Sequence, residues 1–289
     1  MSLAPDSPLL HVVAEPECHC ASSIPEVAQW HAFSGGLAEF KDLLANRIPK
    51  NDHVIWVVAK QRAARGSLPG MVVAGRPVGL MFANKAEEFS AQWFAGNSLE
   101  SRSQRAVLAQ WDDTYLPIGR HWLRELRKNA KGKNIDWMAN KIGGPRLCRQ
   151  LATGARLCVY FGHGHSDGLA GYHGVYIDDF LAEPSFGRVD TFLSFSCQNL
   201  AQPHGQPCLG RELVRSGRVQ AFWGSVGHVA TDANQELARL GIQILLNPKV
   251  VCIGDWIQNM NEIIQDENSR SLSSAWRLYR LVGNPVALI

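Results

Sequence analysis

Three apolar segments in the second half of the chain each end in small or reactive residues. The segments are 157–161 before Gly162-His163-Gly164, 191–196 before Cys197, and 219–223 before Gly224-Ser225. Short continuous apolar runs are typical of strands buried on both faces of a parallel sheet. Expected helices separate or follow them, near 209–216 and 233–246, so the pattern predicts an α/β fold. Because open parallel sheets bind ligands at the carboxyl ends of their strands, His163 and Cys197 are expected at one edge.

The first half of the chain shows the same alternation less clearly. The expected elements are a helix over 35–48, a strand over 52–60, a hairpin over 71–82, and mostly helical structure over 84–131. Pro117 is a plausible first-turn residue of a helix that continues through Arg127. A soft division near residue 150 separates an N-terminal α/β part (1–150) from a catalytic part (151–289).

Composition excludes several classes of protein. A net charge of +3 without a basic block does not predict nucleic-acid binding, and basic residues over 120–133 read as the solvated face of a helix. No apolar run is long enough to cross a membrane, and no signal peptide is recognisable, so a cytoplasmic protein is expected. Seven scattered cysteines favour reduced thiols. Cys18-His19-Cys20 lacks the second ligand pair that a zinc knuckle needs.

His163 and Cys197 form a candidate catalytic pair. They lie 34 residues apart, a distance that a strand, a crossover and a second strand can close. Cysteine is nucleophilic as the thiolate, and a neighbouring imidazole can take its proton. Because Gly164 has no side chain, its N–H can approach the carbonyl oxygen of a substrate. The N–H of Cys197 is a second candidate donor. Together they predict an oxyanion hole.

These residues resemble the gingipain-like peptidases, relatives of caspases and CHAT-domain proteases. Residues 157–164 (LCVYFGHG) look like the family's apolar strand with Gly-His-Gly, and 192–197 (FLSFSC) look like its nucleophile strand. Residues 210–214 (GRELV) and 219–225 (VQAFWGS) are similar to the following helix and strand. The end, 276–285 (WRLYRLVGNP), resembles the closing segment, where Asp is commoner than Asn284. The resemblance covers about residues 150–289.

The resemblance implies a caspase-like α/β/α sandwich that hydrolyses peptide bonds without a cofactor. By that likeness His163 is general base and acid, Cys197 forms the acyl-enzyme, and Gly164 helps to bind the oxyanion. Some relatives add a carboxylate that orients the histidine, and Asp112 and Asp113 are candidates by position. A simpler interpretation is that residues 111–114 end one helix and start the next.

The substrate pocket is expected beside the nucleophile. The residues expected to form it are Gly162, Phe195, Ser196, Trp223, Gly224, Ser225 and Asp113, with the stretch 223–229 as one wall. An acidic floor, from Asp113 or Asp232, would select Arg or Lys in the substrate, whereas Arg120 would select Asp. Trp223 could instead narrow the pocket.

Two other functions compete with a peptidase. His163-Gly164-His165-Ser166-Asp167 reads as His-x-His-x-Asp, which resembles the metal-binding start of metallo-β-lactamase-like hydrolases, although Gly168 replaces a further His. A catalytically inactive caspase-like binding module is the other. A cytoplasmic peptidase is expected to perform limited proteolysis of a specific partner. Family-level precedents cut a pore-forming gasdermin or act in antiphage defence.

Overall fold

The computed structural model describes residues 10–14, 28–33, 37–49, 52–58, 71–74, 76–83, 88–89, 92, 104–129, 135–139, 143–171, 174–183, 187–202 and 206–289. The strands of this part of the chain are β1 (Leu10–Ala14), β2 (Ala28–Ala32), β3 (His53–Val58), β4 (Val72–Val73), β5 (Arg76–Phe82), β6 (Arg105–Ala109), β7 (Ile135–Met138), β8 (Ala155–Phe161), β9 (Gly164–His165), β10 (Gly168–Leu169), β11 (Val175–Tyr176), β12 (Val189–Phe195), β13 (Val219–Ser225) and β14 (Tyr279–Gly283). The helices are α1 (Leu37–Arg47), α4 (Leu116–Asn129), α5 (Gly144–Gln150), α6 (Ile177–Ala182), α7 (Leu209–Arg215), α8 (Thr231–Leu245), α9 (Ile253–Asp266) and α10 (Arg270–Trp276).

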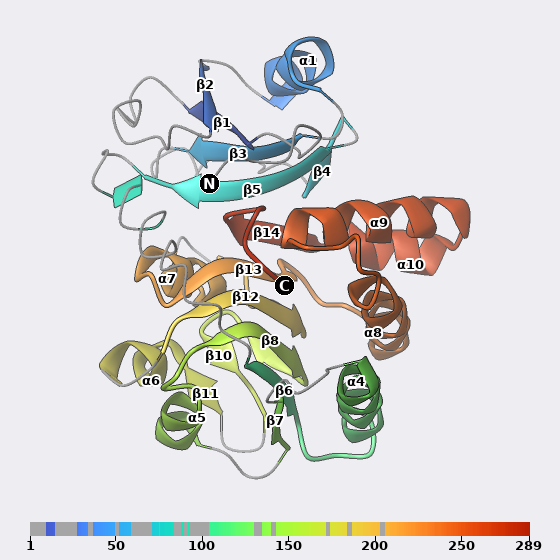
Figure 1. The fold of residues 1–289 in the computed structure, drawn as a ribbon. Coiled ribbons are helices and arrows are strands. Elements are labelled where there is room, and N and C mark those ends of the chain that lie inside the picture. The colour runs from blue at the N-terminus through green and yellow to red at the C-terminus, as the bar shows by residue number, and fades with distance from the viewer. Residues whose placement is uncertain are drawn as a thin grey trace.

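One long sheet runs through the molecule from β2 at one edge to β7 at the other (Figure 1). The strand order is β2-β1-β3-β5-β14-β13-β12-β8-β6-β7, with β4 paired to β5 beside this path. Neighbours along the path pair in parallel, except β13 and β14, which are antiparallel. The sheet therefore consists of two parallel blocks that run in opposite directions. The predicted α/β fold with a mostly parallel sheet is confirmed.

Helices cover both faces of the block that runs from β13 to β7. In Figure 1, α4, α8, α9 and α10 lie on one face, and α5, α6 and α7 lie on the other. Two hydrophobic clusters correspond to these faces, one with buried residues from α4, α8, α9 and α10, and one with buried residues from α5, α6 and α7. The central strands of this block, β8, β12 and β13, are almost entirely buried, as expected for strands that helices cover on both faces.

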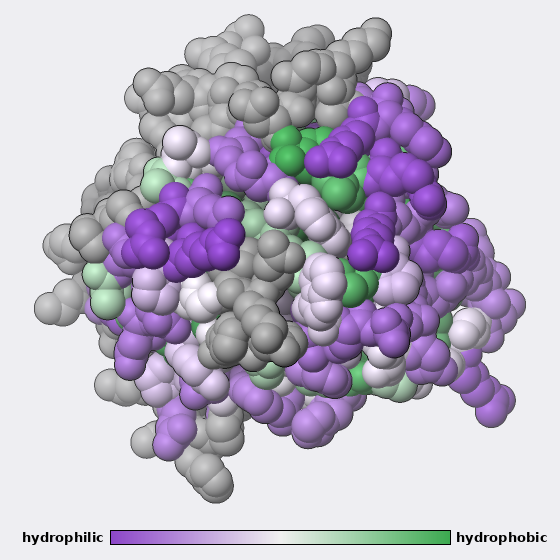
Figure 2. Space-filling view, turned by 90° about the horizontal axis from the view of Figure 1, so that it is seen from below, coloured by the Kyte–Doolittle hydropathy of each residue, from purple (hydrophilic) through white to green (hydrophobic). Residues whose placement is uncertain are grey.

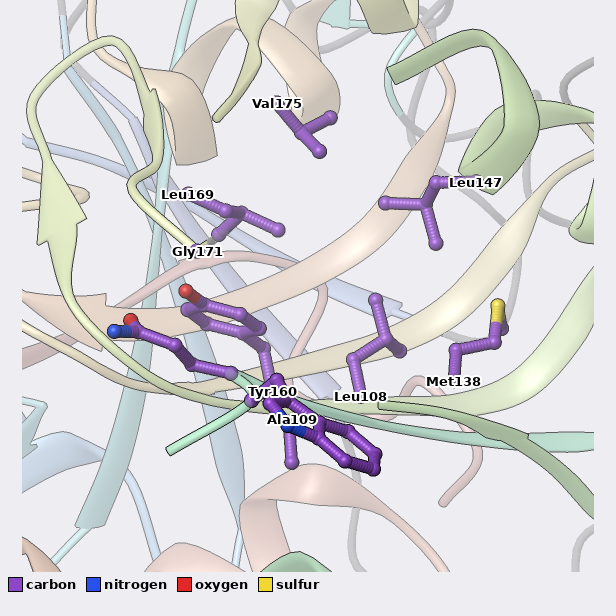
Figure 3. A pocket seen from close by; sticks show the side chains of 10 residues that line it. Leu108, Ala109, Met138, Leu147, Tyr160, Leu169, Gly171 and Val175 are labelled. Atoms are coloured by element: carbon purple, nitrogen blue, oxygen red, sulfur yellow. The ribbon is translucent and has the colours of Figure 1, made fainter. Parts of the chain in front are cut away.

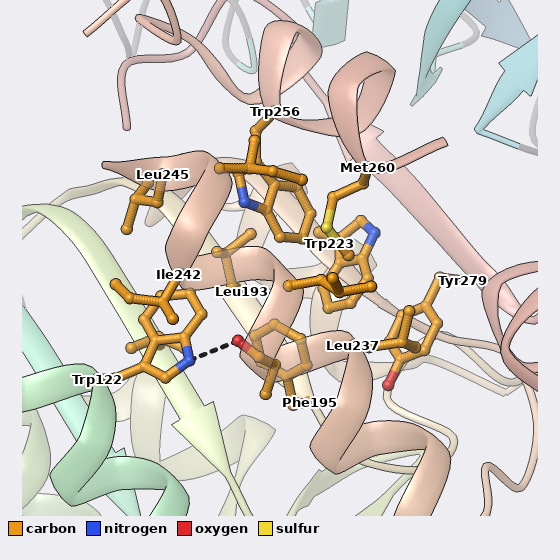
Figure 4. Packing of buried hydrophobic residues seen from close by; sticks show 14 of the residues in the cluster. Trp122, Leu193, Phe195, Trp223, Leu237, Ile242, Leu245, Trp256, Met260 and Tyr279 are labelled. Carbon is orange, nitrogen blue, oxygen red and sulfur yellow. Dashed lines mark hydrogen bonds between the residues drawn. The ribbon is translucent and has the colours of Figure 1, made fainter. Parts of the chain in front are cut away.

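Aromatic side chains form the core beneath the carboxyl ends of β8, β12 and β13 (Figure 4). Phe161 stacks on Phe195 with ring centroids 5.1 Å apart, and Trp223 stacks on Tyr279 at 3.9 Å. The Trp122 indole N–H donates to the backbone oxygen of Ala238 on α8 at 2.8 Å. Each fully buried ring contributes about 1.5–3 kcal/mol relative to exposure. This packing gives the strand ends a rigid base.

Most predicted elements are confirmed. These are α1, β3, the β4–β5 hairpin, α4 with Pro117 in its first turn, β8, β12, α7, β13 and α8. The mostly helical prediction for 84–131 is wrong at residues 105–109, which form β6. Its Ala and Leu residues favour helix locally, but pairing with β8 and β7 buries the segment as a strand. Cys18-His19-Cys20 lies outside the described residues.

The surface of α4 is solvated, as predicted. Arg120, Arg124, Arg127 and Lys128 are exposed on this helix, whereas Trp122 is fully buried. Hydrophilic residues cover much of the face in Figure 2, and its green apolar patches are small. Among the described helices, none combines the length and apolar character needed to cross a membrane. The division of the chain near residue 150 stays a prediction, although strands from both sides of it share the long sheet.

Candidate active site

His163 and Cys197 follow the ends of two neighbouring parallel strands. β8 and β12 pair with Phe161 opposite Phe195, and the two candidate residues each lie two positions beyond that pair. The loops that follow are in direct contact, because a Cβ added to Gly164 would lie 2.4 Å from the backbone oxygen of Cys197. Only glycine fits at this approach. The structure thus brings the pair to the same edge of the sheet.

Asn199 ties the two loops together. Its side chain is fully buried, and its Oδ1 accepts hydrogen bonds from the hydroxyls of Ser194, at 2.6 Å, and Ser196. Its Nδ2 donates to the backbone oxygens of His165 and Gly168 at 2.7 and 2.8 Å. All of these hydrogen bonds of the side-chain amide are made inside the protein, so the hairpin that follows His163 is fixed to the loop that carries Cys197. Sequence reasoning missed Asn199, because an amide just after a strand reads as an ordinary loop residue.

Cys197 is half-buried and lies against the loop between β13 and α8. The N–H of Val229 donates to its Sγ at 3.3 Å, and the thiol lies 3.6 Å from the oxygen of the same residue. Gln198 follows with a φ of 61°, in the left-handed region that non-glycine residues seldom occupy. Its N–H donates to the oxygen of Gly227 at 3.1 Å. This turn holds the thiol beyond the strand end and beside the loop after β13.

His163 has a fixed backbone and an exposed side chain. Its N–H donates to Oε1 of Gln110 at 3.0 Å, and its oxygen accepts from the Tyr160 hydroxyl at 2.8 Å and the Ala170 N–H at 2.9 Å. The imidazole Nδ1 lies 3.4 Å from the Tyr115 hydroxyl, and the two rings meet edge to face at 82°. Both the main chain and the ring are therefore positioned by residues around the loop after β6.

The two candidate carboxylates have different places. Asp112 Oδ1 accepts two backbone N–H groups at the start of α4, at 3.0 and 2.8 Å, and its Oδ2 accepts the Gln110 amide at 2.9 Å. Through Gln110 it connects to the backbone of His163, whereas the ring contacts Tyr115. Asp112 therefore starts a helix, as the simpler interpretation held, although the residues before it form a strand. Asp113 is exposed.

The aromatic walls predicted for the substrate pocket are part of the core. Phe195 is 1% exposed, between Phe161 and Trp223, and Trp223 is fully buried against Tyr279. Their side chains pack against α4, α8 and α9 and cannot line an open pocket. The prediction for these two side chains is corrected: they support the strand ends from below.

Four further predicted pocket residues, Gly162, Ser196, Gly224 and Ser225, are also buried, whereas Asp113 is exposed. Ser196 and Ser225 are fully buried, and their hydroxyls bond to Asn199 and to the oxygen of Gly227. A Cβ at Gly162 would lie 2.2 Å from the Tyr160 hydroxyl, and one at Gly224 would lie 2.7 Å from the Phe222 ring. These positions are closely packed, so a substrate can reach them only through backbone groups.

An apolar pocket lies on the face of the sheet opposite the aromatic core (Figure 3). It lies next to Tyr160, which supports the backbone of His163. Tyr160 contributes its ring to the pocket and its hydroxyl to the His163 backbone oxygen. Trp111, 48% exposed, also borders the pocket. The lining residues are Leu108, Ala109, Gln110, Trp111, Met138, Leu147, Tyr160, Leu169, Gly171 and Val175. The pocket shares none of these with the walls predicted from sequence.

Two clusters carry residue types that can ligate a metal: His163, His165 and Asp167, and a second group that contains His53. Among the described residues, one His/Cys/Asp/Glu group has ligand atoms close enough for a metal, and it does not contain His163, His165 or Asp167. The predicted His-x-His-x-Asp ligand set therefore does not converge.

The group that converges is His53, Cys252 and Asp255, under the start of α9. His53 Nε2 lies 3.2 Å from Asp255 Oδ1 and 3.4 Å from Cys252 Sγ. Burial is the largest single influence and acts to raise the pKa of Asp255, but the hydrogen bonds from His53, the Val251 N–H and Cys252, with the charge of His53, together leave that pKa below its ordinary value. A metal-bound histidine usually donates its other N–H to an acceptor, and the buried His53 Nδ1 has no partner in the described structure. The trio fits a hydrogen-bonded cluster better than a metal centre.

The five described cysteines differ in burial. Burial raises the pKa of Cys148 to about 12 and that of Cys208 to about 11, and it raises the pKa values of Cys158 and Cys252 further. Cys197 is the half-buried one.

We expect iodoacetamide at neutral pH to modify Cys197 at least about tenfold faster than the four buried cysteines, because thiolates are the reactive species. Peptide mapping by mass spectrometry checks this, and equal labelling of Cys148 or Cys208 would contradict it.

A parallel sheet between two layers of helices, with histidine and cysteine on adjacent strand ends, is the architecture of caspase-like cysteine peptidases. The model of peptidase family C25 matches residues 80–289, so the chain belongs to this family and is a cysteine peptidase of the gingipain type. A search of curated proteins found no match.

Solved structures share the fold. The crystal structure of the Arg-specific cysteine proteinase gingipain R is 11% identical with a TM-score of 0.76, covering 98% of this chain and 78% of that one. The complex of the pro- and mature domains of RgpB from Porphyromonas gingivalis is 12% identical with a TM-score of 0.71, covering 97% and 79%. A chain of the Saccharomyces cerevisiae separase–securin complex is 10% identical with a TM-score of 0.53, covering 84% and 16%. The caspase-like fold predicted from the motifs is confirmed.

Proposed function

We propose that this peptidase uses Cys197 as nucleophile and His163 as general base and acid. The observation that carries the proposal is their equivalent placement beyond the paired ends of β8 and β12, with Gly164 packed on the Cys197 backbone. The aromatic core beneath both strands supplies the rigid support that a catalytic pair needs. Asn199 adds a second connection between the two loops.

The backbone N–H groups of Gly164 and Cys197 are the proposed oxyanion hole. The Ala170 N–H donates to the His163 oxygen, so His163 and Ala170 form a hydrogen-bonded pair of the antiparallel ladder. Hydrogen-bonded and non-bonded pairs alternate in an antiparallel ladder, so Gly164, opposite Leu169, belongs to a non-bonded pair. Its N–H therefore points away from β10. This direction supports a role in binding a ligand oxygen.

The chemistry follows from these positions. His163 takes the Sγ proton, the thiolate attacks the scissile carbonyl carbon, and the carbonyl oxygen gains the negative charge. Collapse of this intermediate breaks the C–N bond, and the leaving amine takes the proton from the imidazolium. Water, deprotonated by His163, then attacks the thioester and releases the acid product and the thiol.

A specific protein partner is the proposed substrate, cut at one or a few sites in the cytoplasm. A pore-forming gasdermin or another defence effector is the candidate partner, and its support is the resemblance to bacterial caspase-like proteases alone. The buried positions around the pair support selectivity, because they leave little open space beside the nucleophile.

A peptide-library cleavage profile tests the proposal. Products are identified by mass spectrometry in the presence of iodoacetamide, of EDTA, or of neither. We expect cleavage that iodoacetamide abolishes and EDTA leaves intact. Loss with EDTA alone would favour a metallohydrolase, and an absence of products from every peptide would favour a binding module. The profile also gives the P1 residue: Arg or Lys would match an acidic floor from Asp113 or Asp232, and Asp would match Arg120.

A further inference from the structure

Tyr115 lies where it can act directly on the imidazole of His163. Its hydroxyl is 3.4 Å from Nδ1, and the ring centroids are 5.2 Å apart in an edge-to-face contact. A hydrogen bond of this length in a substrate-free site is loose, and such bonds tighten when substrate binds. Within the described part of the chain, this hydroxyl is the side-chain group within hydrogen-bonding distance of the His163 ring.

The position of Tyr115 is determined by its surroundings. Its backbone N–H donates to Asp112 Oδ1 at 2.8 Å, and its side chain is 5% exposed within the cluster that contains Phe161 and Phe195. Thr231, at the start of α8, is near enough to the hydroxyl for its hydrogen-bonding influence to lower the pKa of Tyr115. The phenol thus has neighbours in both the β6–α4 loop and the β13–α8 loop. A side chain fixed in this way can fix its neighbour in turn.

We propose that the Tyr115 hydroxyl is the positioning group for His163, in the place where other hydrolases use a carboxylate. This proposal rests on the proposed function of His163. With Nδ1–H donated to the phenol oxygen, Nε2 is left as the base. The same bond is stronger when the ring is an imidazolium, because charge-assisted hydrogen bonds are stronger than neutral ones. Tyr115 therefore favours the thiolate–imidazolium pair.

The Tyr115 phenol stays protonated while it positions His163. Burial raises the pKa of Tyr115, and the charges of Cys197 and Asp112 act in the same direction against the hydrogen-bonding influence of Thr231. The titratable groups that face Tyr115 are His163, Cys197, Asp112, Tyr160 and Tyr279. A neutral orienting group stabilises an imidazolium less than a carboxylate does.

Tyr115→Phe tests the proposal without a known substrate. This variant keeps the ring and its packing and removes the hydroxyl alone. The readout is the rate at which iodoacetamide alkylates Cys197, followed by peptide mapping from pH 5 to 9. We expect the rate at pH 7 to fall about tenfold, since a hydrogen bond to a charged group is lost, and the rise of the profile to move to higher pH. Thermal unfolding is measured alongside.

Tyr279→Phe is the matched control. Tyr279 is a fully buried phenol of the same cluster, and its hydroxyl donates to Asn234 rather than to the catalytic pair. We expect this variant to lose stability but to keep the wild-type alkylation profile. A wild-type profile in Tyr115→Phe would overturn the proposal, and so would the same shift in both variants. If Cys197→Ala keeps full peptidase activity, the proposed function itself fails, and that result is distinguishable from a negative result at Tyr115.

Discussion

Replacing Cys197 with alanine should lower peptide hydrolysis by roughly 10⁴-fold or more, because the acyl-enzyme cannot form without the sulfur. The fold should survive. The thiol is half-buried at the end of β12, and its contacts are to the backbone of Val229. The measurement is kcat/KM on the best peptide from the cleavage profile, together with the thermal unfolding midpoint. We expect an unfolding midpoint within a few degrees of the wild type.

Cys208→Ala separates the loss of a nucleophile from the loss of any thiol. Cys208 is fully buried before α7, and burial raises its pKa to about 11, so it is a small core residue. This variant should hydrolyse the peptide within about twofold of the wild-type rate while it loses on the order of 1 kcal/mol of stability. Hydrolysis that persists in Cys197→Ala would place the nucleophile elsewhere. A biological effect that persists without hydrolysis would point to a binding module.

The strand ends that carry the proposed catalytic pair were predictable because the signal is local. Residues 157–161 are all apolar, and 191–196 combine Phe and Leu with Thr and Ser; both patterns favour buried strands, and a reactive residue follows within two positions of each. Parallel pairing then places both ends at one edge. Because Phe161 pairs with Phe195, the two strands end level with each other, and the two loops that follow are in close contact.

The surroundings of the pair were not predictable because they depend on contacts between distant segments. Tyr115 reaches His163 across 48 residues, and nothing in the sequence near Tyr115 distinguishes it from a core aromatic. Phe195 and Trp223 were expected to face a substrate because each lies near the end of a strand at the edge of the sheet expected to carry Cys197. Their orientation is decided by α4, α8 and α9, which cover that face and bury both rings. Tertiary packing likewise overrides helix propensity in β6.

Asn199→Asp should be the most damaging single-atom change near the site. The variant keeps an acceptor for Ser194 and Ser196 but replaces the Nδ2 donor with an oxygen. The backbone oxygens of His165 and Gly168 then lose a buried donor and face a carboxylate. Each buried group left without its partner costs about 1–3 kcal/mol, so we expect the free energy of unfolding to fall by roughly 2–5 kcal/mol. Chemical denaturation measures this loss.

The same change should also lower activity, because Asn199 joins the hairpin after His163 to the loop that carries Cys197. The matched control is Asn247→Asp, at an exposed asparagine whose Oδ1 accepts the Lys249 N–H and can still do so as aspartate. It should change stability by less than about 0.5 kcal/mol. If Asn199→Asp matched this control in stability and hydrolysed peptide at the wild-type rate, the two loops would be held by backbone packing at Gly164 alone. A loss of hydrolysis beyond the unfolded fraction, measured well below the unfolding midpoint, would show that this amide maintains the catalytic geometry as well as the fold.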